Sequence, residues 1–285
     1  MPVSAPLKLM KPKSRLSSRK PILKWAGGKF QLLDRLFERF PVGFERFVEP
    51  MVGGGALFFG LAAPKSIIAD CNPELINFYR TVVSDLDGIE KTLSQWSVDE
   101  KTFYKVRSLR FEELSETVAA ARMLFLNRTC FNGLYRVNKQ GQFNVPWGRY
   151  AQPKIFDRER LEAARACLTK AEILLGDYEE VLLASAKEGD VVFLDPPYLP
   201  ISKYSDFKRY TKQQFHETDH LRMAEVVREI RSRGCHTLIT NSNHPLMHEL
   251  YAEFQIDVID TRRNINSRAD RRTGQDIIIT IPPQK

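Results

Sequence analysis

The stretch Arg46-Phe47-Val48-Glu49-Pro50-Met51-Val52-Gly53-Gly54-Gly55-Ala56-Leu57-Phe58 reads as a strand, a glycine turn and the start of a helix. The apolar residues before the turn are typical of a short buried strand. Glycines allow the backbone to approach a ligand closely at the carboxyl edge of a sheet. The pattern is neither a G-x-G-x-x-G dinucleotide fingerprint nor a Walker loop, since no G-K-[ST] follows. A plain glycine-rich turn and a ligand-binding turn both remain compatible with it.

Four further apolar segments with the character of strands follow along the chain: 66–72 (SIIADCN), 171–177 (AEILLGD), 191–198 (VVFLDPPY) and 235–243 (CHTLITNSN). Amphipathic helical patterns lie between them, such as 221–234, which ends at Gly234 as a helix commonly does. Strands that alternate with helices predict an open, mainly parallel α/β sheet. The late segment 276–282 (DIIITIP) is expected to form an antiparallel edge strand.

The middle of the chain has a different pattern. Residues 84–169 are mostly helical in pattern, and within them LYRV (134–137) and QFNV (142–145) flank NKQG. Two short apolar runs around a glycine-containing turn predict a hairpin, at about 132–150. We therefore expect a catalytic sheet built from residues 21–83 and 170–285, with 84–169 inserted as a second domain.

Composition limits the class of protein. The 285 residues are 43% hydrophobic and 27% charged, which is typical of a globular protein, and no apolar run approaches the roughly 20 residues of a membrane span. A net charge of +8 favours a polyanionic partner. Residues 1–20 form a basic tail that we expect to be disordered. The four cysteines form no C-x-x-C pair, so we expect no metal or redox motif and a reducing, cytoplasmic setting.

The strand at 191–194 runs directly into Asp195-Pro196-Pro197-Tyr198. Prolines end strands, so this corner has a purely structural explanation. It also suits a flat, polar ligand. An ionised Asp195 accepts hydrogen bonds, the Pro196 carbonyl is a second acceptor at a fixed turn, and Tyr198 offers a ring face. An aromatic amine could donate to both acceptors and present its lone pair to an electrophile. The corner therefore favours methyl transfer to such an amine.

Two other features add to this interpretation. Asp70 ends the strand that follows the glycine turn, where a carboxylate can accept hydrogen bonds from ribose hydroxyls, although such residues are often helix caps. Trp25 lies between Lys24 and Lys29 beside paired glycines. It is either a packing anchor between two solvated lysines or a ring that packs on a ligand, with Lys29 near a carboxylate.

In this order, KWAGGK (24–29), EPMVGGGALF (49–58), Asp70, FNGLYRVNKQGQFNVPWGRY (131–150) and DPPY (195–198) resemble the D12 class of adenine-N6 DNA methyltransferases, in its Dam branch. The resemblance covers about residues 20 to 280. It implies a Rossmann-like S-adenosylmethionine-dependent methyltransferase sheet with an inserted, mainly helical DNA-recognition domain that carries a β-hairpin. It further implies double-stranded DNA as partner, no membrane, no metal, a monomer or weak dimer, and a cytoplasmic, nucleoid-associated location.

The resemblance also assigns residues. The catalytic set is Asp195, Pro196 and Tyr198. The S-adenosylmethionine set is Trp25, Lys29, Gly53, Gly55, Asp70, Asp177 and Asp195. The DNA-binding set is Lys24, Asn132, Leu134, Arg136, Pro146, Arg149 and Tyr150. Cys130 departs from the family pattern, in which an aromatic residue or glycine often precedes the Asn-Gly pair.

The hairpin bears on the target sequence. In the major groove, arginine pairs with guanine and an apolar side chain meets the thymine methyl group. Leu134 and Arg136 lie two residues apart and so on one face of a strand. Because the matching residues of Dam-type enzymes read GATC, we expect GATC. Three alternatives stay open: a longer site beginning with GAT in a restriction-modification system, an RNA or protein acceptor, and a DNA-binding protein without activity.

A base inside a duplex must flip out to reach such a pocket. Two groups of residues late in the chain are candidates for closing over it and for contacting phosphates, although each is also compatible with helix packing or a solvated face. They are Lys203, Tyr204, Phe207, Lys208, Arg209, Tyr210 and Phe215, and the cluster Arg262, Arg263, Arg268, Arg271 and Arg272.

Overall fold

The computed structural model describes residues 20–200, 215–262 and 273–284. The strands are β1 (Arg46–Glu49), β2 (Ser66–Asp70), β3 (Ala171–Leu175), β4 (Asp190–Leu194), β5 (His236–Ser242), β6 (Gln255–Arg262) and β7 (Thr273–Ile281). The α-helices are α1 (Leu33–Phe37), α2 (Ala56–Leu61), α3 (Pro73–Ser84), α4 (Leu86–Leu93), α5 (Glu100–Ser108), α6 (Glu116–Thr129), α7 (Arg158–Leu168), α8 (Tyr178–Ser185), α9 (Glu217–Ser232) and α10 (Pro245–Leu250). Three 3-10 turns complete the set: η1 (Lys29–Leu32), η2 (Phe111–Glu113) and η3 (Phe131–Gly133).

The seven strands form one sheet in the order β3-β2-β1-β4-β5-β7-β6. The first five pair in parallel, which confirms the predicted α/β sheet, and β7 pairs antiparallel with both β5 and β6. The expectation that 276–282 forms an edge strand was wrong. Most of this segment belongs to β7, which lies between β5 and β6, and β6 is the edge strand. Ile277, Ile278 and Ile279 are all fully buried. Such a continuous apolar run belongs to a strand that is covered on both faces.

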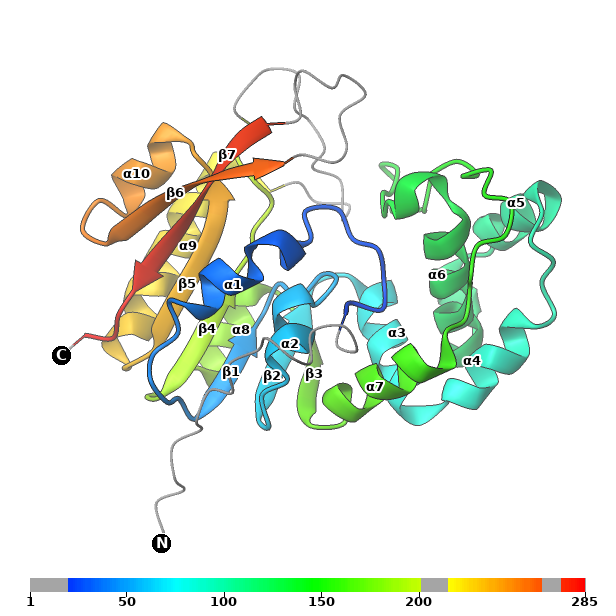
Figure 1. Ribbon diagram of the computed structural model, residues 1–285, viewed down its shortest axis with the longest axis horizontal. Coiled ribbons are helices and arrows are strands. Elements are labelled where there is room, and N and C mark those ends of the chain that lie inside the picture. The colour runs from blue at the N-terminus through cyan, green and yellow to red at the C-terminus, as the bar shows by residue number, and fades with distance from the viewer. Residues whose placement is uncertain (1–19, 201–214, 263–272, 285) are drawn as a thin grey trace, which may run out of the picture.

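Helices cover both faces of the sheet (Figure 1). Successive residues of a strand point to opposite faces, so Phe47 and Phe193 join the core beneath α1 and α2, whereas Val48 and Val192 join the core beneath α8, α9 and α10. The helix α9 ends just before Gly234, whose φ of +90° confirms the predicted C-terminal signal.

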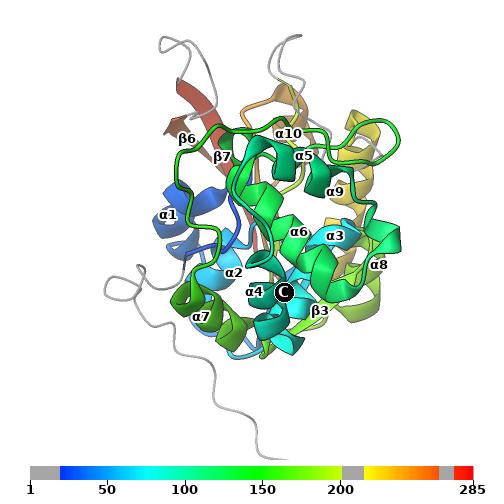
Figure 2. The same ribbon diagram turned by 90° about the vertical axis from the view of Figure 1, so that its right-hand side faces the viewer.

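The helices α4 to α7 lie beyond the β3 edge of the sheet (Figures 1 and 2). The helix α3 connects the two parts, because it packs on β2 and β3 and also along α6. Phe78 of α3 and Phe125 of α6 belong to the same buried cluster as Phe47 of the sheet. The hydrophobic core therefore runs without a break from one face of the sheet into the helical segment.

The segment between α6 and α7 contains the predicted hairpin in an irregular form. Its two arms pair through isolated bridges, Val137 with Phe143 and Cys130 with Trp147, rather than through regular strands. The Asn144 N–H donates to the Arg136 carbonyl oxygen at 3.0 Å. The basic tail, the late aromatic and basic candidates before Phe215, and the arginines after Arg262 lie outside the described residues.

Candidate active site at the switch point of the sheet

The sheet order reverses between β1 and β4, which are parallel neighbours. In open α/β sheets, ligands bind at the carboxyl ends of the strands at such a switch point, since the connecting loops diverge to opposite faces. The glycine turn follows β1 and the Asp195–Tyr198 corner follows β4. The fold therefore brings together the two motifs that the sequence singled out.

Asp195 is held on both of its oxygens. The Lys29 ammonium lies 2.7 Å from Oδ2, and the Thr240 hydroxyl donates to Oδ1 at 2.7 Å. The Lys29 side chain is only 8% exposed, which excludes the interpretation of this residue as a solvated lysine. A carboxylate offers about four lone-pair positions. Asp195 can therefore accept a further hydrogen bond while these two contacts fix its orientation.

The turn after Asp195 is anchored to the end of β5. The Leu199 N–H donates to Asn241 Oδ1 at 3.2 Å, and the Ser242 hydroxyl donates to the Leu199 carbonyl at 2.7 Å. The Lys29 ammonium also lies 4.6 Å from the centroid of the Tyr198 ring. Sequence reasoning missed these β5 residues, whose signal was the polar ending of an otherwise apolar strand.

The glycine turn packs tightly against Trp25. A Cβ atom on Gly53 would lie 2.8 Å from the indole Nε1, and one on Gly54 would lie 2.7 Å from the Trp25 Cβ. The Tyr79 hydroxyl donates to the Gly53 carbonyl at 2.6 Å. Gly53 and Gly55 also have positive φ angles of 46° and 67°. Side chains at these positions would displace the ring or strain the backbone, so the glycines are required by close packing.

Asp70 and Asp177 both hold local backbone. Asp70 accepts from the Gly53 N–H at 3.0 Å and from the Asn72 N–H at 2.9 Å, and burial raises the pKa of its carboxyl group. Asn72, not Asp70, caps the start of α3. Asp177 caps α8 by accepting from the Glu179 N–H at 3.0 Å, and its side chain remains 41% exposed. Both carboxylates lie at the carboxyl edge of the sheet with acceptor capacity left.

Glu49 is a buried acid that the sequence analysis quoted but gave no role. Its carboxyl group accepts from the Phe58 N–H at 3.0 Å, near the start of α2. Burial and the nearby negative charge of Asp195 raise the pKa of Glu49 well above its ordinary value, and the Lys29 charge opposes this only in part. The site therefore favours a neutral Glu49 beneath the ion pair of Lys29 and Asp195.

The predicted DNA-binding residues fall into two groups. Lys24, Asn132 and Tyr150 come together: the Lys24 ammonium lies 4.9 Å from the Tyr150 ring centroid, and the Tyr150 hydroxyl accepts from the Asn132 N–H at 3.0 Å. The exposed Arg136 donates through Nε to Asn144 Oδ1 at 2.8 Å, on the hairpin.

The remaining hairpin predictions differ in exposure. Pro146 and Arg149 are exposed, and Leu134 is half-buried against the core. Cys130 is fully buried and donates to the Leu134 carbonyl at 3.3 Å, so it packs beneath the hairpin instead of facing a ligand. Phe131 is 50% exposed beside Asn132.

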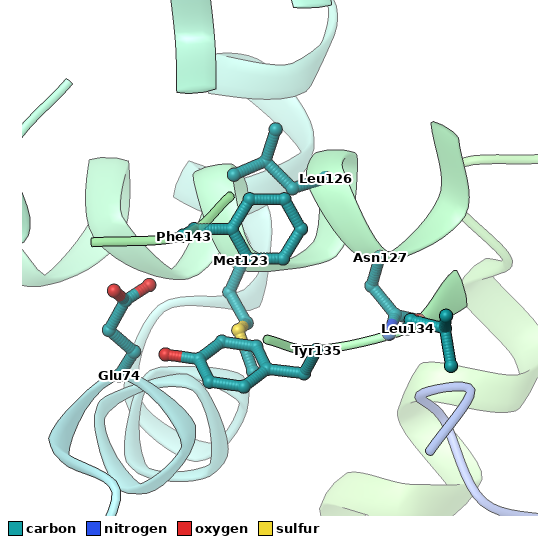
Figure 3. Close-up of a pocket in the computed structure, with 7 residues that line it drawn as sticks. All are labelled: Glu74, Met123, Leu126, Asn127, Leu134, Tyr135 and Phe143. Carbon is teal, nitrogen blue, oxygen red and sulfur yellow. The ribbon is translucent and has the colours of Figure 1, made fainter. Parts of the chain in front are cut away.

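Asp195 lines neither of two hollows on the molecule. A narrow crevice lies between α3, α6 and the hairpin (Figure 3), and a cavity of about 370 Å³ lies near the end of β7, among Arg231, Glu253, Phe254, Gln255, Thr280 and Pro282. Residues 20–200, 215–262 and 273–284 contain no group of three side chains placed to hold a metal. Every helix within these ranges is too short or too polar to cross a bilayer.

Comparison with known proteins supplies the family. The family model of the D12 class of N6 adenine-specific DNA methyltransferases matches residues 25–265. The chain belongs to this family. D12-class enzymes use S-adenosylmethionine. The glycine turn, the Trp25 ring and the Asp70 and Asp195 carboxylates lie at one edge of the sheet, and a ring face beside hydrogen-bond acceptors is chemically compatible with the apolar, hydroxyl and amine parts of that cofactor.

Three relatives align with nearly the whole chain. The type II methyltransferase M1.LlaDCHI of Lactococcus lactis subsp. cremoris is 39% identical over 94% of this chain and 97% of its own length. The type II methyltransferase M.MjaIII of Methanocaldococcus jannaschii is also 39% identical, over 89% of this chain and 95% of its own. The DNA adenine methylase of Escherichia coli K12 is 32% identical over 93% and 96%.

Proposed function

We propose that this adenine-N6 DNA methyltransferase acts on an adenine flipped out of duplex DNA, within the sequence GATC. The observation that carries the catalytic part is the Asp195 carboxylate, fixed by Lys29 and Thr240 beside the Tyr198 ring. A carboxylate fixed in this way can accept one N–H of the adenine amine without reorganising. The Pro196 carbonyl accepts the second N–H, and Tyr198 stacks on the base.

S-adenosylmethionine supplies an electrophilic methyl group. The chain's own residues orient the acceptor: with both amine hydrogens directed at Asp195 and Pro196, the nitrogen lone pair points out of the ring plane. After transfer, the amine nitrogen carries a positive charge, and its proton leaves to Asp195 or to water. On the cofactor side, we propose contacts to Trp25, Lys29, Gly53, Gly55, Asp70, Asp177 and Asp195.

We propose that residues 84–169 form the recognition domain and that its hairpin reads the site. Arg136 is exposed on the hairpin and suits a guanine, while Leu134 suits the thymine methyl group. Lys24, Asn132, Pro146, Arg149 and Tyr150 complete the proposed DNA contacts. The relatives named DNA adenine methylases support adenine in DNA as the target base.

A role beside a restriction endonuclease is the second candidate. Its support is that the two relatives at 39% identity are named type II methyltransferases, whereas the DNA adenine methylase of Escherichia coli K12 stands at 32%. In that case the chemistry is unchanged, and the recognition sequence is GATC or a longer site that begins with GAT.

Methylation mapping tests the target. Purified protein and S-adenosylmethionine are incubated with unmethylated genomic DNA, and the modified bases are located by single-molecule sequencing. We expect N6-methyladenine at every GATC. Modification confined to a longer site would correct the hairpin assignment and keep the chemistry. Absence of modified adenine, with cofactor binding intact, would reject the proposed function.

The variant Asp195→Asn tests the catalytic assignment. The amide keeps the shape of the side chain but replaces one acceptor oxygen by a donor. We expect the rate of methyl transfer to fall by about 100-fold or more, as when one fixed polar group is removed from a reacting centre. Duplex binding should remain within about threefold, because apart from the contact to the adenine amine the proposed DNA contacts lie on other residues. Retained turnover would contradict the assigned role of Asp195.

A further inference from the structure

Tyr135 lies between the two residues that we assign to base reading, and its side chain points the other way. Arg136 is exposed and Leu134 is half-buried, whereas only 7% of Tyr135 is exposed. Its ring enters the crevice between α3, α6 and the hairpin, with the hydroxyl directed toward Glu74 (Figure 3). Any displacement of Leu134 or Arg136 therefore acts on a buried aromatic ring.

The Tyr135 ring stacks on Trp25. The two ring centroids are 5.3 Å apart and the planes differ by 18°. Trp25 in turn lies directly on Gly53 and Gly54, and the Gly53 N–H donates to Asp70. A continuous series of contacts thus leads from the hairpin through two aromatic rings to the turn and the carboxylate that we assign to S-adenosylmethionine.

The other end of Tyr135 reaches the same edge of the sheet by a second route. Its hydroxyl points toward Glu74, in the first turn of α3 (Figure 3). Asn72 caps that helix and also donates its backbone N–H to Asp70. Tyr135 therefore lies against Trp25 and also beside the start of α3, whose cap residue Asn72 holds the Asp70 carboxylate.

The hairpin has isolated bridges in place of a regular β-ladder, and backbone bonds such as those from the Phe131 N–H to the Pro146 carbonyl and from the Asn138 N–H to the Gln142 carbonyl, both 2.9 Å, join its arms. Two non-glycine residues at its ends, Asn132 and Arg149, have positive φ angles of 55°. Segments with few ladder hydrogen bonds open at low free-energy cost. Side-chain packing, to which the buried Tyr135 contributes, therefore adds to the few backbone bonds that order this hairpin.

We propose that Tyr135 is a positioning residue that couples cofactor binding to DNA recognition. This inference rests on the proposed cofactor and hairpin assignments. A cofactor that immobilises Trp25 also immobilises Tyr135, and with it Leu134 and Arg136. Cognate DNA that orders the hairpin orders Trp25 in return. Each ligand orders residues that the other ligand must also order, so that binding of one lowers the entropy cost of binding the other. The coupling is therefore reciprocal.

The test measures binding rather than turnover. Dissociation constants for S-adenosylhomocysteine, which has no methyl group to transfer, are determined by calorimetry with and without a duplex containing the mapped site. In the natural protein we expect the duplex to tighten binding by about fivefold or more, within the usual range of coupling between sites. Tyr135→Leu should bring this factor to about 1, whereas Tyr135→Phe, which keeps the ring, should retain most of it.

Phe143→Leu is the matched control. Phe143 is a buried hairpin ring that contacts Tyr135, with centroids 5.7 Å apart, and it belongs to the same crevice. It should keep the coupling factor, since the contact between Tyr135 and Trp25 survives. Equal loss in Phe143→Leu and Tyr135→Leu would assign the effect to hairpin packing and overturn the proposal. If the natural protein binds both ligands but the duplex leaves the dissociation constant of S-adenosylhomocysteine unchanged, the coupling is overturned and the proposed sites stand. If the natural protein binds neither ligand, the proposed sites are overturned as well.

Discussion

Asp195 depends on neighbours that are distant in the sequence. Thr240 is fully buried and donates to Asp195 from the next strand, 45 residues later. Thr240→Val keeps the volume of the side chain and removes the hydrogen bond. We expect kcat to fall by about tenfold with KM nearly unchanged, because a hydrogen bond to a charged group is worth roughly 1.5–3 kcal/mol.

Thr237→Val provides the control for this experiment. Thr237 is also fully buried on β5, and its hydroxyl has no hydrogen-bond partner among residues 20–200, 215–262 and 273–284. Steady-state kinetics should therefore separate the two variants. Equal kcat in Thr240→Val and Thr237→Val would show that the Thr240 hydroxyl does not orient Asp195.

The raised pKa of Glu49 predicts that the free energy of unfolding depends on pH. Its pKa is raised in the folded protein, so between its ordinary and its raised pKa the folded state binds more protons than the unfolded state. The stabilisation from this group is complete below the ordinary pKa of glutamate and is lost as the pH rises through the folded pKa. Glu49→Gln mimics the protonated form and should remove this loss.

Urea unfolding of both proteins at about pH 5 and about pH 8 measures the effect, since glutamate ordinarily titrates near pH 4.3. Between the two pH values, the free energy of unfolding should fall by less in Glu49→Gln than in the natural protein. The glutamine oxygen can still accept from the Phe58 N–H, so the start of α2 keeps its contact. Parallel pH profiles would contradict a raised pKa at Glu49.

Sequence patterns identified the acid, the glycines and the tyrosine of the candidate site, because each stands at the end of a recognisable strand. They did not identify what holds these residues. Asp195 neutralises Lys29 and lies near Glu49, and both of these residues stand more than 100 positions earlier in the chain. Local hydrophobic periodicity contains no information on such pairs, and so a buried lysine was also read as a solvated one.

The helices α3 and α6 are joined by a buried ion pair. Arg122 lies 2.7 Å from Glu74 and donates to the carbonyls of Val106 and Arg107, and both charged side chains are at most 9% exposed. Removing the arginine leaves a buried carboxyl group without its cation. We expect Arg122→Met to destabilise the protein by about 3–5 kcal/mol in urea unfolding.

Two further variants make this prediction specific. Adding Glu74→Gln to Arg122→Met should recover part of the loss, because the unpaired acid is then removed. Arg158→Ala breaks contacts of 2.5 Å to Asp87 and Glu90 in a side chain that is 45% exposed, and it should destabilise the protein far less than Arg122→Met, because water screens exposed ion pairs. Comparable losses in Arg122→Met and Arg158→Ala would contradict a special role for the buried pair.

The strands show where sequence patterns succeed. Short apolar runs that end in polar residues located all five parallel strands, since a strand buried on both faces must be apolar throughout. The edge strand β6 mixes apolar and charged residues, none of the described ones being buried, and was missed, so that β7 was taken for the edge. The hairpin was predicted from its turn, but its irregular pairing depends on packing of Tyr135 and Phe143, which no turn signal contains.

The net charge of +8 leads to a prediction about the salt dependence of DNA binding. Binding that neutralises phosphates releases counterions, and the logarithm of the association constant then falls linearly with the logarithm of salt concentration. Lys24 is exposed, and its backbone is clamped by Asn127, which accepts from the Lys24 N–H at 2.9 Å and donates to its carbonyl at 2.7 Å. Lys24→Gln should weaken binding to all duplexes and reduce the magnitude of the salt slope by about 1.

Lys170→Gln removes the same charge elsewhere. Lys170 is exposed immediately before β3, at the amino-terminal edge of the sheet and so opposite the candidate site. In titrations of a labelled duplex at several salt concentrations, Lys170→Gln should show the same salt slope of the association constant as the natural protein. If both variants lower the slope equally, the attraction arises from net charge alone. A reduction confined to Lys24→Gln would instead locate a phosphate contact beside Tyr150 and Asn132, at the base of the recognition hairpin.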